Sequence, residues 1–335
     1  MGKRRGNFYA TRTGMVINPA HAYSRIAGVG VVFPSFNVSV YEDVKAALTH
    51  RSVDPDTKLM VFAVGQQTLA LVLKQMTFHH VAQGQLNGHT WAAFFCVCCN
   101  MGTSAVPIVN GRVHRFRVTG IYNGMSMMSD DETRSVWEHI TGECIRGALQ
   151  GAQLKTRPTQ YLTVAQLVES VPDAKIAVSK ASWRSRLLDA LLLRRMLAPT
   201  GYMPGVFRLS LTQSDNRLPE LELGLGIWMD GHARFYPMNT IRDQNNALID
   251  TLDQQRMVIY IDPTSSTPAA HRTTSRIQGW DDDTLVLDSG ERIRNGCVLN
   301  AASEQHLIDR PNQQFTRWFG FSYMFPACEI FSSDT

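Results

Sequence analysis

Short apolar runs separated by polar turns dominate the chain. Between residues 59 and 155 the runs LMVFAV, WAAFFCVC, HRFRVTGIY and SMMSDD alternate with the turns NGH, NGR and NGM. Runs of this length, most of them rich in β-branched and aromatic residues, predict strands, and Asn-Gly between two runs predicts a tight hairpin turn. These residues therefore predict a first β-rich half built from hairpins.

Three segments have helical spacing instead. They are SVYEDVKAALTHR at residues 39–51, TVAQLVESV from Thr163 and SWRSRLLDALLLRRML from Ser182. The strand pattern resumes after LPELELGLGIWMDGHARFYPM. We expect an α+β fold that is mostly β. Its four parts are an N-terminal segment with a short helix (residues 1–58), the first β-rich half (59–155), a helical connector (156–210) and a second β-rich half (211–335).

The predicted helix at residues 182–197 is both apolar and basic. Its leucines and arginines include Leu187, Leu188, Leu191, Leu192, Arg184, Arg186, Arg194 and Arg195. A basic amphipathic helix suits a membrane surface or an acidic partner. A helix packed on the protein with a solvated basic edge is more common, and we favour that interpretation.

The two β-rich halves align with each other. A shift of 166 positions superimposes them without a gap over about forty residues. The aligned pairs include Gly65 with Gly231, His79 with Asn245, Cys96 with Asp262 and Cys99 with Ser265. An internal repeat predicts two halves of related fold. Because the cysteines occur in only one half, structural need alone does not explain them.

Composition and charge exclude several classes of protein. Hydrophobic residues make up 44% of the 335 residues and charged residues 19%, which is typical of a globular protein. With a net charge of only +4 and no Lys/Arg block interleaved with aromatics, we expect no nucleic-acid partner. No apolar run reaches the roughly 18 residues of a membrane span, and the start MGKRRGNFYATRTG lacks the apolar run of a signal peptide. The cytoplasm is therefore the default expectation.

The cysteines carry the strongest chemical signal. Three of the six lie at positions 96 to 99, and Cys96 and Cys99 have the C-x-x-C spacing that lets two sulfurs converge on one ion. His79 or His80 is the expected third ligand, because a hairpin turn near QLNGH folds that segment back beside the cysteine strand. Which of the two histidines faces the sulfurs stays open. Thiolates with an imidazole suit copper(I) or zinc.

Two alternatives to a metal site remain. AAFFCVCC is apolar enough to be a core strand with buried cysteines. A thiol/disulfide pair is the other alternative, but a redox C-x-x-C normally opens a helix, whereas this one ends a predicted strand. Cys144, Cys297 and Cys328 stand alone, so a site closed by four thiolates is not expected. A metal would have few protein ligands and an open coordination position.

Residues 120–154 carry the remaining candidates. Tyr122, Asn123 and His139 are expected as catalytic residues in the wall of a pocket, and His139 also as a further ligand. Met125, Met127 and Met128 offer soft thioethers to copper. Taken singly, each of these residues is more often an ordinary core or surface residue. The chain has no nucleophile elbow, Walker loop or H-E-x-x-H motif.

Three stretches together resemble one protein family: FFCVCCN, YNGMSMMSDDETRSVWEHITGECIRGALQGAQL and RWFGFSYMFPACEIF. The family is catalogued as domain of unknown function 3179, and the resemblance covers roughly residues 59 to 331. It implies equivalent positions at His79, Cys96, Cys99, Tyr122, Asn123 and Trp137. Val97 stands where many members have Pro, and Cys98 is an additional thiol, so both bear on the site geometry. The resemblance implies no activity.

The sequence thus predicts a metal-dependent enzyme, with copper ahead of zinc, that acts on a small molecule by an oxidative or hydrolytic reaction. The alternative is a non-catalytic protein, either a metal carrier or a scaffold that meets a partner through residues 182–197.

Overall fold

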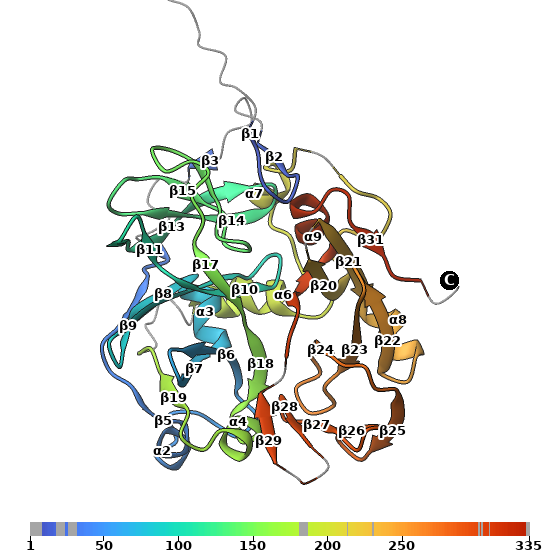
Figure 1. Cartoon of the computed structure of the whole chain (residues 1–335). Coiled ribbons are helices and arrows are strands. Elements are labelled where there is room, and N and C mark those ends of the chain that lie inside the picture. Colours follow the sequence, from blue (N-terminus) through green and yellow to red (C-terminus); the bar gives the residue numbers. More distant parts are fainter. Residues whose placement is uncertain are drawn as a thin grey trace, which may run out of the picture.

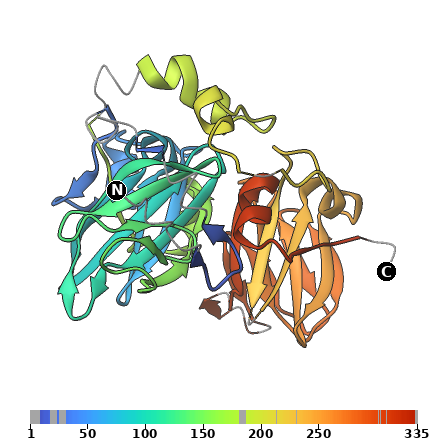
Figure 2. The same cartoon turned by 90° about the horizontal axis from the view of Figure 1, so that it is seen from above.

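Antiparallel hairpins make most of this protein, as the alternating runs predict (Figure 1). The structure is a computed structural model. It describes residues 9–17, 24–25, 32–180, 187–212, 214–229, 231–300, 302, 304–307 and 309–332. The prediction of a mostly β fold is confirmed: several sheets and a few short helices form the described part of the chain. Figure 2 shows an N-terminal body, blue to green, beside a C-terminal body, orange to red.

The described residues of the first half form three five-stranded sheets. One has the order β18 (Gln160–Thr163), β6 (Lys58–Val64), β7 (Gln67–Val72), β19 (Lys175–Ala177), β5 (Glu42–Asp43). The second has the order β17 (Lys155–Pro158), β10 (Met101–Val106), β9 (His89–Cys96), β8 (Val81–Leu86), β4 (Phe36–Val38). The third has the order β16 (Cys144–Arg146), β15 (Val136–Trp137), β14 (Met125–Asp130), β13 (Phe116–Tyr122), β3 (Ser24–Arg25). Two small ladders pair β1 (Tyr9–Ala10) with β2 (Val16–Ile17) and β11 (Ile108–Val109) with β12 (Arg112–Val113).

The Asn-Gly turns close hairpins where the sequence predicts them. Asn87–Gly88 joins β8 to β9, and Asn123–Gly124 joins β13 to β14. Both residues of each turn have positive φ, 48° and 80° in the first and 47° and 71° in the second. This is the type I′ geometry whose twist matches that of the flanking strands.

In the second half, the residues that the structure describes form three sheets. One has the order β30 (Asn312–Arg317), β20 (Leu223–Met229), β21 (His232–Pro237), β31 (Glu329–Ile330). Another has the order β22 (Ala247–Leu252), β23 (Gln255–Ile261), β24 (Pro268–Arg272). The last has the order β25 (Ile277–Asp281), β26 (Thr284–Leu287), β27 (Arg292–Arg294), β28 (Cys297–Leu299), β29 (Gln305–Leu307). The order strand, strand, helix and three strands occurs in both halves. In the first it is β6, β7, α3 (Leu73–His79), β8, β9, β10, and in the second β20, β21, α8 (Met238–Asp243), β22, β23, β24.

The segment expected as a helical connector is partly sheet. Within residues 156–210, β18 lies beside β6 and β19 beside β7, so both complete a sheet of the first half. The helix predicted from Thr163 is present as α4 (Val164–Ser170), with Thr163 and Gln166 forming a capping box. The strands on either side of α4 are too short to show a period in the sequence. They cover strand edges that would otherwise leave backbone groups unpaired.

Of the two other predicted helices, residues 39–51 contain α2 (Val44–Thr49). Residues 182–186 lie outside the described part of the chain, and residues 187–197 are helical, including η2 (Asp189–Leu193) and α6 (Arg194–Leu197). Leu193 and Met196 are buried on one face, whereas Leu187 is 50% and Leu191 64% exposed. A short helix, α7 (Gly205–Arg208), follows. None of the described helices is long and apolar enough to span a membrane.

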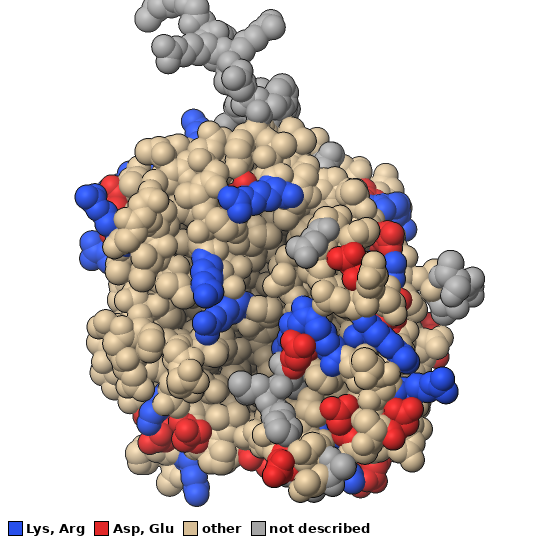
Figure 3. All heavy atoms as spheres, in the orientation of Figure 1, with Lys and Arg blue, Asp and Glu red and all other residues tan. Residues whose placement is uncertain are grey.

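Basic and acidic side chains are interspersed over the second half, and the face of Figure 1 is hollowed near its middle (Figure 3). Five arginines among the described residues of the second half lie in ion pairs. The pairs are Arg217 with Asp215, Arg234 with Asp250 and Glu329, Arg272 with Asp309, Arg292 with Asp281 and Arg294 with Asp283. Residues 211–335 contain 10 arginines and no lysine against 17 Asp and Glu, so the positive net charge of the chain comes from residues 1–210.

Candidate metal centre

The C-x-x-C stretch forms the turn of a hairpin. Cys96 is the last residue of β9 and pairs with Met101, the first residue of β10, so residues 97–100 make the turn. Asn100 has a φ of 56°, a conformation that Asn tolerates better than most residues. The Cys99 thiol donates to the carbonyl oxygen of Cys96 at 3.8 Å. The turn therefore brings the two sulfurs to the same side of the hairpin end.

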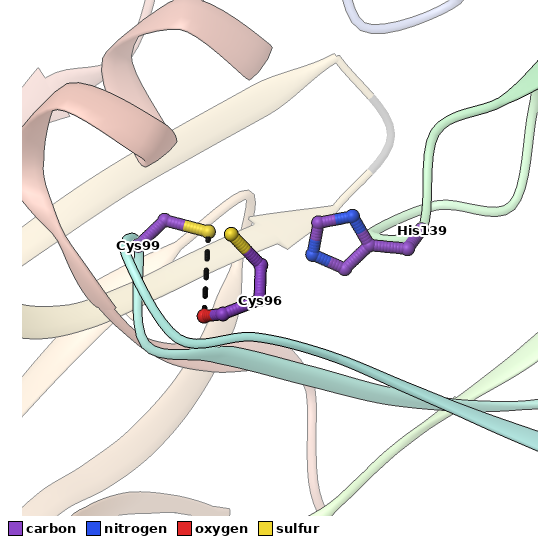
Figure 4. A group of neighbouring side chains, drawn as sticks. All are labelled: Cys96, Cys99 and His139. Carbon is purple, nitrogen blue, oxygen red and sulfur yellow. Dashed lines mark hydrogen bonds between the residues drawn. The ribbon is translucent and has the colours of Figure 1, made fainter. Parts of the chain in front are cut away.

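His139 completes the group. It follows β15, and its ring lies so that one nitrogen and the two sulfurs of Cys96 and Cys99 are all within 4.8 Å of one another. Figure 4 shows the imidazole directed at the sulfurs. Cys96 and Cys99 have no exposed surface and His139 is 1% exposed. Two soft sulfurs and a nitrogen thus converge in a dry interior.

Burial and hydrogen bonding set the charge states of these groups. Burial lowers the pKa of His139 to about 4, so its ring is neutral at pH 7. Burial by itself raises the pKa of Cys96, but hydrogen bonds from Cys99 and Ser126 outweigh it and bring the pKa to about 7. One of these donors is the backbone N–H of Ser126, 3.4 Å from the Cys96 sulfur. Burial raises the pKa of Cys99, so the pair without a bound ion carries at most one negative charge.

Buried polar atoms without a partner gather around the cysteine turn. Near the turn, such atoms among the described residues are Nδ1 and Nε2 of His139, Nε of Arg317 and the hydroxyl of Tyr161. Arg317 donates its backbone N–H to the Cys99 carbonyl, and Tyr161 lies against Gly102, three residues after Cys99. Orphaned buried polar atoms are rare in native proteins, and a group of them calls for a missing partner such as an ion.

The sequence profile of one protein family matches residues 32–327, and its description is "protein of unknown function" (DUF3179). The chain belongs to the DUF3179 family. The match includes Cys96, Cys99 and His139 and begins ahead of residue 59, where the resemblance read from the motifs begins. Comparison with curated proteins and with solved structures gives no match.

The DUF3179 position expected as the third ligand, His79, does not join the cysteines. It ends α3, where Nδ1–H donates to the Pro34 carbonyl at 2.7 Å and Nε2 accepts the Ser179 hydroxyl at 2.8 Å. Both ring nitrogens are therefore occupied. His80 lies beside Phe95, the residue before Cys96, and its Nδ1–H donates to the Phe95 carbonyl at 3.0 Å. The hairpin does bring the histidine segment back to the cysteine strand, as expected, but neither ring belongs to the Cys96–Cys99–His139 group.

Tyr122 ends β13 and Asn123 opens the β13–β14 turn, and neither belongs to the Cys96–Cys99–His139 group. Tyr122 is buried, and its hydroxyl donates to the Val16 carbonyl at 3.4 Å. The side-chain oxygen of Asn123 accepts from the N–H and the hydroxyl of Thr212, at 3.1 and 2.6 Å. Asn123 thus fixes the segment at residues 210–212. Part of that segment lines a pocket of about 440 Å³, together with Phe319 and Tyr323.

Trp137, which the resemblance also singles out, belongs to a second group that the structure brings together. Its indole N–H donates to Asp130 at 2.8 Å, and Asp130 also accepts from Thr133 and lies 3.3 Å from His114. Asp130, His114 and Glu132 are close enough to hold a cation. Because the Asp130 oxygens are already occupied by donors of the chain, this group is a hydrogen-bonded core element rather than an open site.

Sequence reasoning missed two residues beside the cysteine turn. Gly320, in α9 (Trp318–Met324), lies so close that a Cβ there would be 2.9 Å from Cys99 Cβ. Arg317 is fully buried although it is charged. An arginine in the otherwise apolar stretch RWFGFSYMF is the signal that could have found it. The three methionines are buried, and Met125 and Met127 share a core cluster with the cysteines, whereas Met128 packs in another.

Proposed function

We propose that the protein binds one transition-metal ion through Cys96, Cys99 and His139 and uses it in an oxidative reaction on a small molecule. Copper is favoured over zinc. The observation that carries the proposal is His139: a buried neutral imidazole faces two thiols, and neither of its ring nitrogens has a hydrogen-bond partner among the residues that the structure describes. Burying such a group without a partner costs about 1–3 kcal/mol. Coordination of an ion would repay that cost.

The donor set supports a soft metal. Thiolate sulfur selects copper(I), zinc and iron-sulfur clusters, and a neutral imidazole suits copper and zinc. Three protein ligands leave a coordination position open, which is the arrangement of catalytic rather than structural zinc sites. When bound, copper would supply one-electron redox chemistry, while the chain's own residues hold the ligands in place and exclude water.

A pocket next to the ligands supports a small-molecule substrate. Helix α9 contributes to both places, because Gly320 contacts Cys99 while Phe319 and Tyr323 line the pocket of about 440 Å³. The pocket mixes these aromatic rings with polar side chains, among them Arg208, Glu220 and Asp215. A concave site with aromatic walls and a few convergent polar groups is typical of ligand binding.

The alternative function is a non-catalytic metal carrier or a scaffold. Complete burial of the two cysteines favours it, because a substrate cannot reach a metal there without movement of the chain. The exposed leucines of residues 187–197 would then offer a surface for a partner. We keep the enzyme as the leading proposal because the pocket shares a helix with the site.

We also propose that the two halves arose from one repeated unit. The second-half equivalents of Cys96 and Cys99 support this, since Asp262 accepts from the Ser265 N–H at 2.7 Å and from its hydroxyl at 2.9 Å. In the first half, the backbone N–H of Cys99 likewise bonds to the side chain of Cys96, which lies three residues earlier, and lowers its pKa. Asn100 and its counterpart Ser266 both have positive φ, 56° and 55°.

Metal analysis of purified variants tests the proposal. The wild type, purified without added metal under reducing conditions, should contain one copper or zinc ion per chain. His139→Phe removes the nitrogens while keeping a ring, and the double variant Cys96→Asp/Cys99→Ser copies the second half, so both should fold and lose copper. Cys144→Ser is the matched control, because Cys144 is an equally buried thiol that donates only to the Arg146 carbonyl.

Wild type with reduced thiols but no stoichiometric metal would refute metal binding. The rate at which the protein releases its metal distinguishes a metal carrier from an enzyme. A carrier should release copper(I) to a competing chelator within minutes, whereas an enzyme should retain it while consuming a reductant and oxygen.

A further inference from the structure

Arg317 is the most deeply buried charge next to the cysteine turn. It ends β30 and begins α9, and its side chain has no exposed surface. One terminal nitrogen donates to the carbonyls of Pro199 and Leu221, at 3.1 and 2.8 Å. The other donates to the carbonyls of Met196 and Ala198, at 3.2 and 2.7 Å. The guanidinium is therefore held in one position by the connector.

In the part of the chain that the structure describes, no carboxylate balances this charge. Among the described residues, no acidic side chain lies within ion-pair distance of Arg317, and its Nε has no hydrogen-bond partner. Glu220, an acidic group near the turn, is itself paired with Arg208 at 2.9 Å. Four carbonyls satisfy hydrogen bonds but carry only partial charge. A buried cation without an anion is strongly unfavourable, so a negative group nearby is required.

The cysteine turn can meet this requirement once a bound metal ion holds Cys99 as a thiolate. Burial lowers the pKa of Arg317, and negative charge at Cys99 or Cys98 acts in the opposite direction. The backbone adds a direct link, because the Arg317 N–H donates to the Cys99 carbonyl at 3.0 Å. The guanidinium of Arg317, which is fixed in position, and the cysteine turn therefore interact electrostatically.

Resting on the proposed metal site, we infer that Arg317 sets the metal preference of the Cys96–Cys99–His139 centre in favour of monovalent copper(I) over divalent zinc. Two thiolates and a neutral imidazole carry two negative charges, and Arg317 offsets one of them. A monovalent ion brings the unit to neutrality, whereas a divalent ion leaves an uncompensated positive charge in a dry interior. Each added charge is costly in a medium of low dielectric constant.

The other titratable groups near the ligands include His80 and Glu138. His80 is neutral at pH 7, since burial lowers its pKa to about 4. Glu138, next to His139 in the chain, turns its carboxylate to the backbone N–H groups of Ile140, Thr141 and Glu143. These three donors hold it on the side of its own turn.

Two substitutions at Arg317 separate charge from structure. Arg317→Met removes the charge and the hydrogen bonds, whereas Arg317→Lys keeps the charge and loses the planar fork. Both should lower the unfolding temperature. Only Arg317→Met should lower the ratio of copper(I) to zinc affinity, on the order of tenfold, measured by competition with chelators of known affinity for each ion. Arg234→Met is the matched control: Arg234 pairs with Asp250 and Glu329 in the second half, so its loss should leave the ratio unchanged.

A second pair of variants keeps the test decisive if Arg317→Met does not fold. Cys98→Asp places a negative charge beside Arg317 and should lower the same ratio, whereas Cys98→Ser should not. Two results would overturn the inference and leave the metal site in place. In one, the ratio of copper(I) to zinc affinity stays within about twofold of wild type in Arg317→Met and Cys98→Asp; in the other, it falls equally in Arg317→Lys and Arg317→Met. Wild type that binds neither ion overturns both.

Discussion

At the scale of single residues, the candidate site depends on a glycine beside the cysteine turn as well as on its ligands. Gly320 packs against the cysteine turn, and a Cβ there would be 2.9 Å from Cys99 Cβ and 3.2 Å from Met101 Cε. Gly320→Ala should therefore push the turn and α9 apart. We expect a loss of about 1–3 kcal/mol in the free energy of unfolding, measured in urea, and a weaker hold on the metal.

Gly205→Ala provides the comparison for this substitution. Gly205 begins α7, and nothing lies within 4 Å of the position its Cβ would take. Alanine there should be neutral or stabilising by up to about 1 kcal/mol, because it restricts the unfolded chain without a clash. Equal losses from both substitutions would contradict the packing argument.

Asp130 is the residue whose charge state should show in the stability of the protein. Burial raises its pKa, but hydrogen bonds from Trp137, Thr133 and His114 outweigh this and hold the pKa below its usual range. The Asp130 carboxylate therefore contributes its full stabilisation at a pH above its pKa in the unfolded chain, near 4. That stabilisation is lost as the pH falls through its lower pKa in the folded protein. Asp130→Asn should cost about 2 kcal/mol at pH 7. The difference from wild type should shrink below pH 4, and a difference that is independent of pH would contradict the assignment.

At the scale of elements, the β13–β14 hairpin acts as a clamp on another segment. Asn123 occupies the first position of the turn with a φ of 47°, and its side chain holds Thr212 through two hydrogen bonds. Asn123→Gly keeps the backbone geometry and removes the acceptor. It should cost about 1–2 kcal/mol. Asn123→Asp keeps the acceptor and should stay near wild type.

Metal content separates this clamp from a catalytic role. If Asn123 only positions residues 210–212, Asn123→Gly should retain full metal content, and hydrogen exchange at Leu211 and Thr212 should become faster. If Asn123 acts in the reaction, Asn123→Asp should lose activity while it keeps both stability and metal.

At the scale of the whole molecule, local patterns predicted the elements but not the contacts between distant ones. Alternating runs and Asn-Gly turns gave the hairpins because strand and turn geometry depend on neighbours in the chain. The C-x-x-C spacing likewise predicted that Cys96 and Cys99 converge. The choice of histidine could not follow from spacing, because the ring of His79 is taken by Pro34 and Ser179, which belong to other segments. Arg317 stands out as an arginine in an apolar stretch, but its partners, the carbonyls of Met196 and Ala198 among them, belong to another segment and could not be predicted.

The contacts between the halves lead to a last prediction. Phe315, Thr316 and Arg317 of β30 all bond to the cysteine turn: Thr316 Oγ–H and Arg317 N–H donate to the Cys99 carbonyl at 3.0 Å, and Asn100 donates to the Phe315 carbonyl at 3.2 Å. An ion bound in the first half should therefore stabilise the second half as well. Free copper(I) at 100 times its dissociation constant should add about 2.7 kcal/mol to the free energy of unfolding.

Calorimetry of the whole chain measures this coupling directly. We expect a single unfolding transition that moves up by a few degrees when copper(I) is buffered at that level, since about 1 kcal/mol shifts the midpoint of a protein of this size by roughly 2 °C. Cys96→Asp/Cys99→Ser should keep a single transition, because the second half uses the same residues at Asp262 and Ser265, and should show no shift with the metal. Two transitions, of which copper moves only one, would mean that the bonds from β30 to the cysteine turn do not couple the halves. The ion would then order only the segment that binds it.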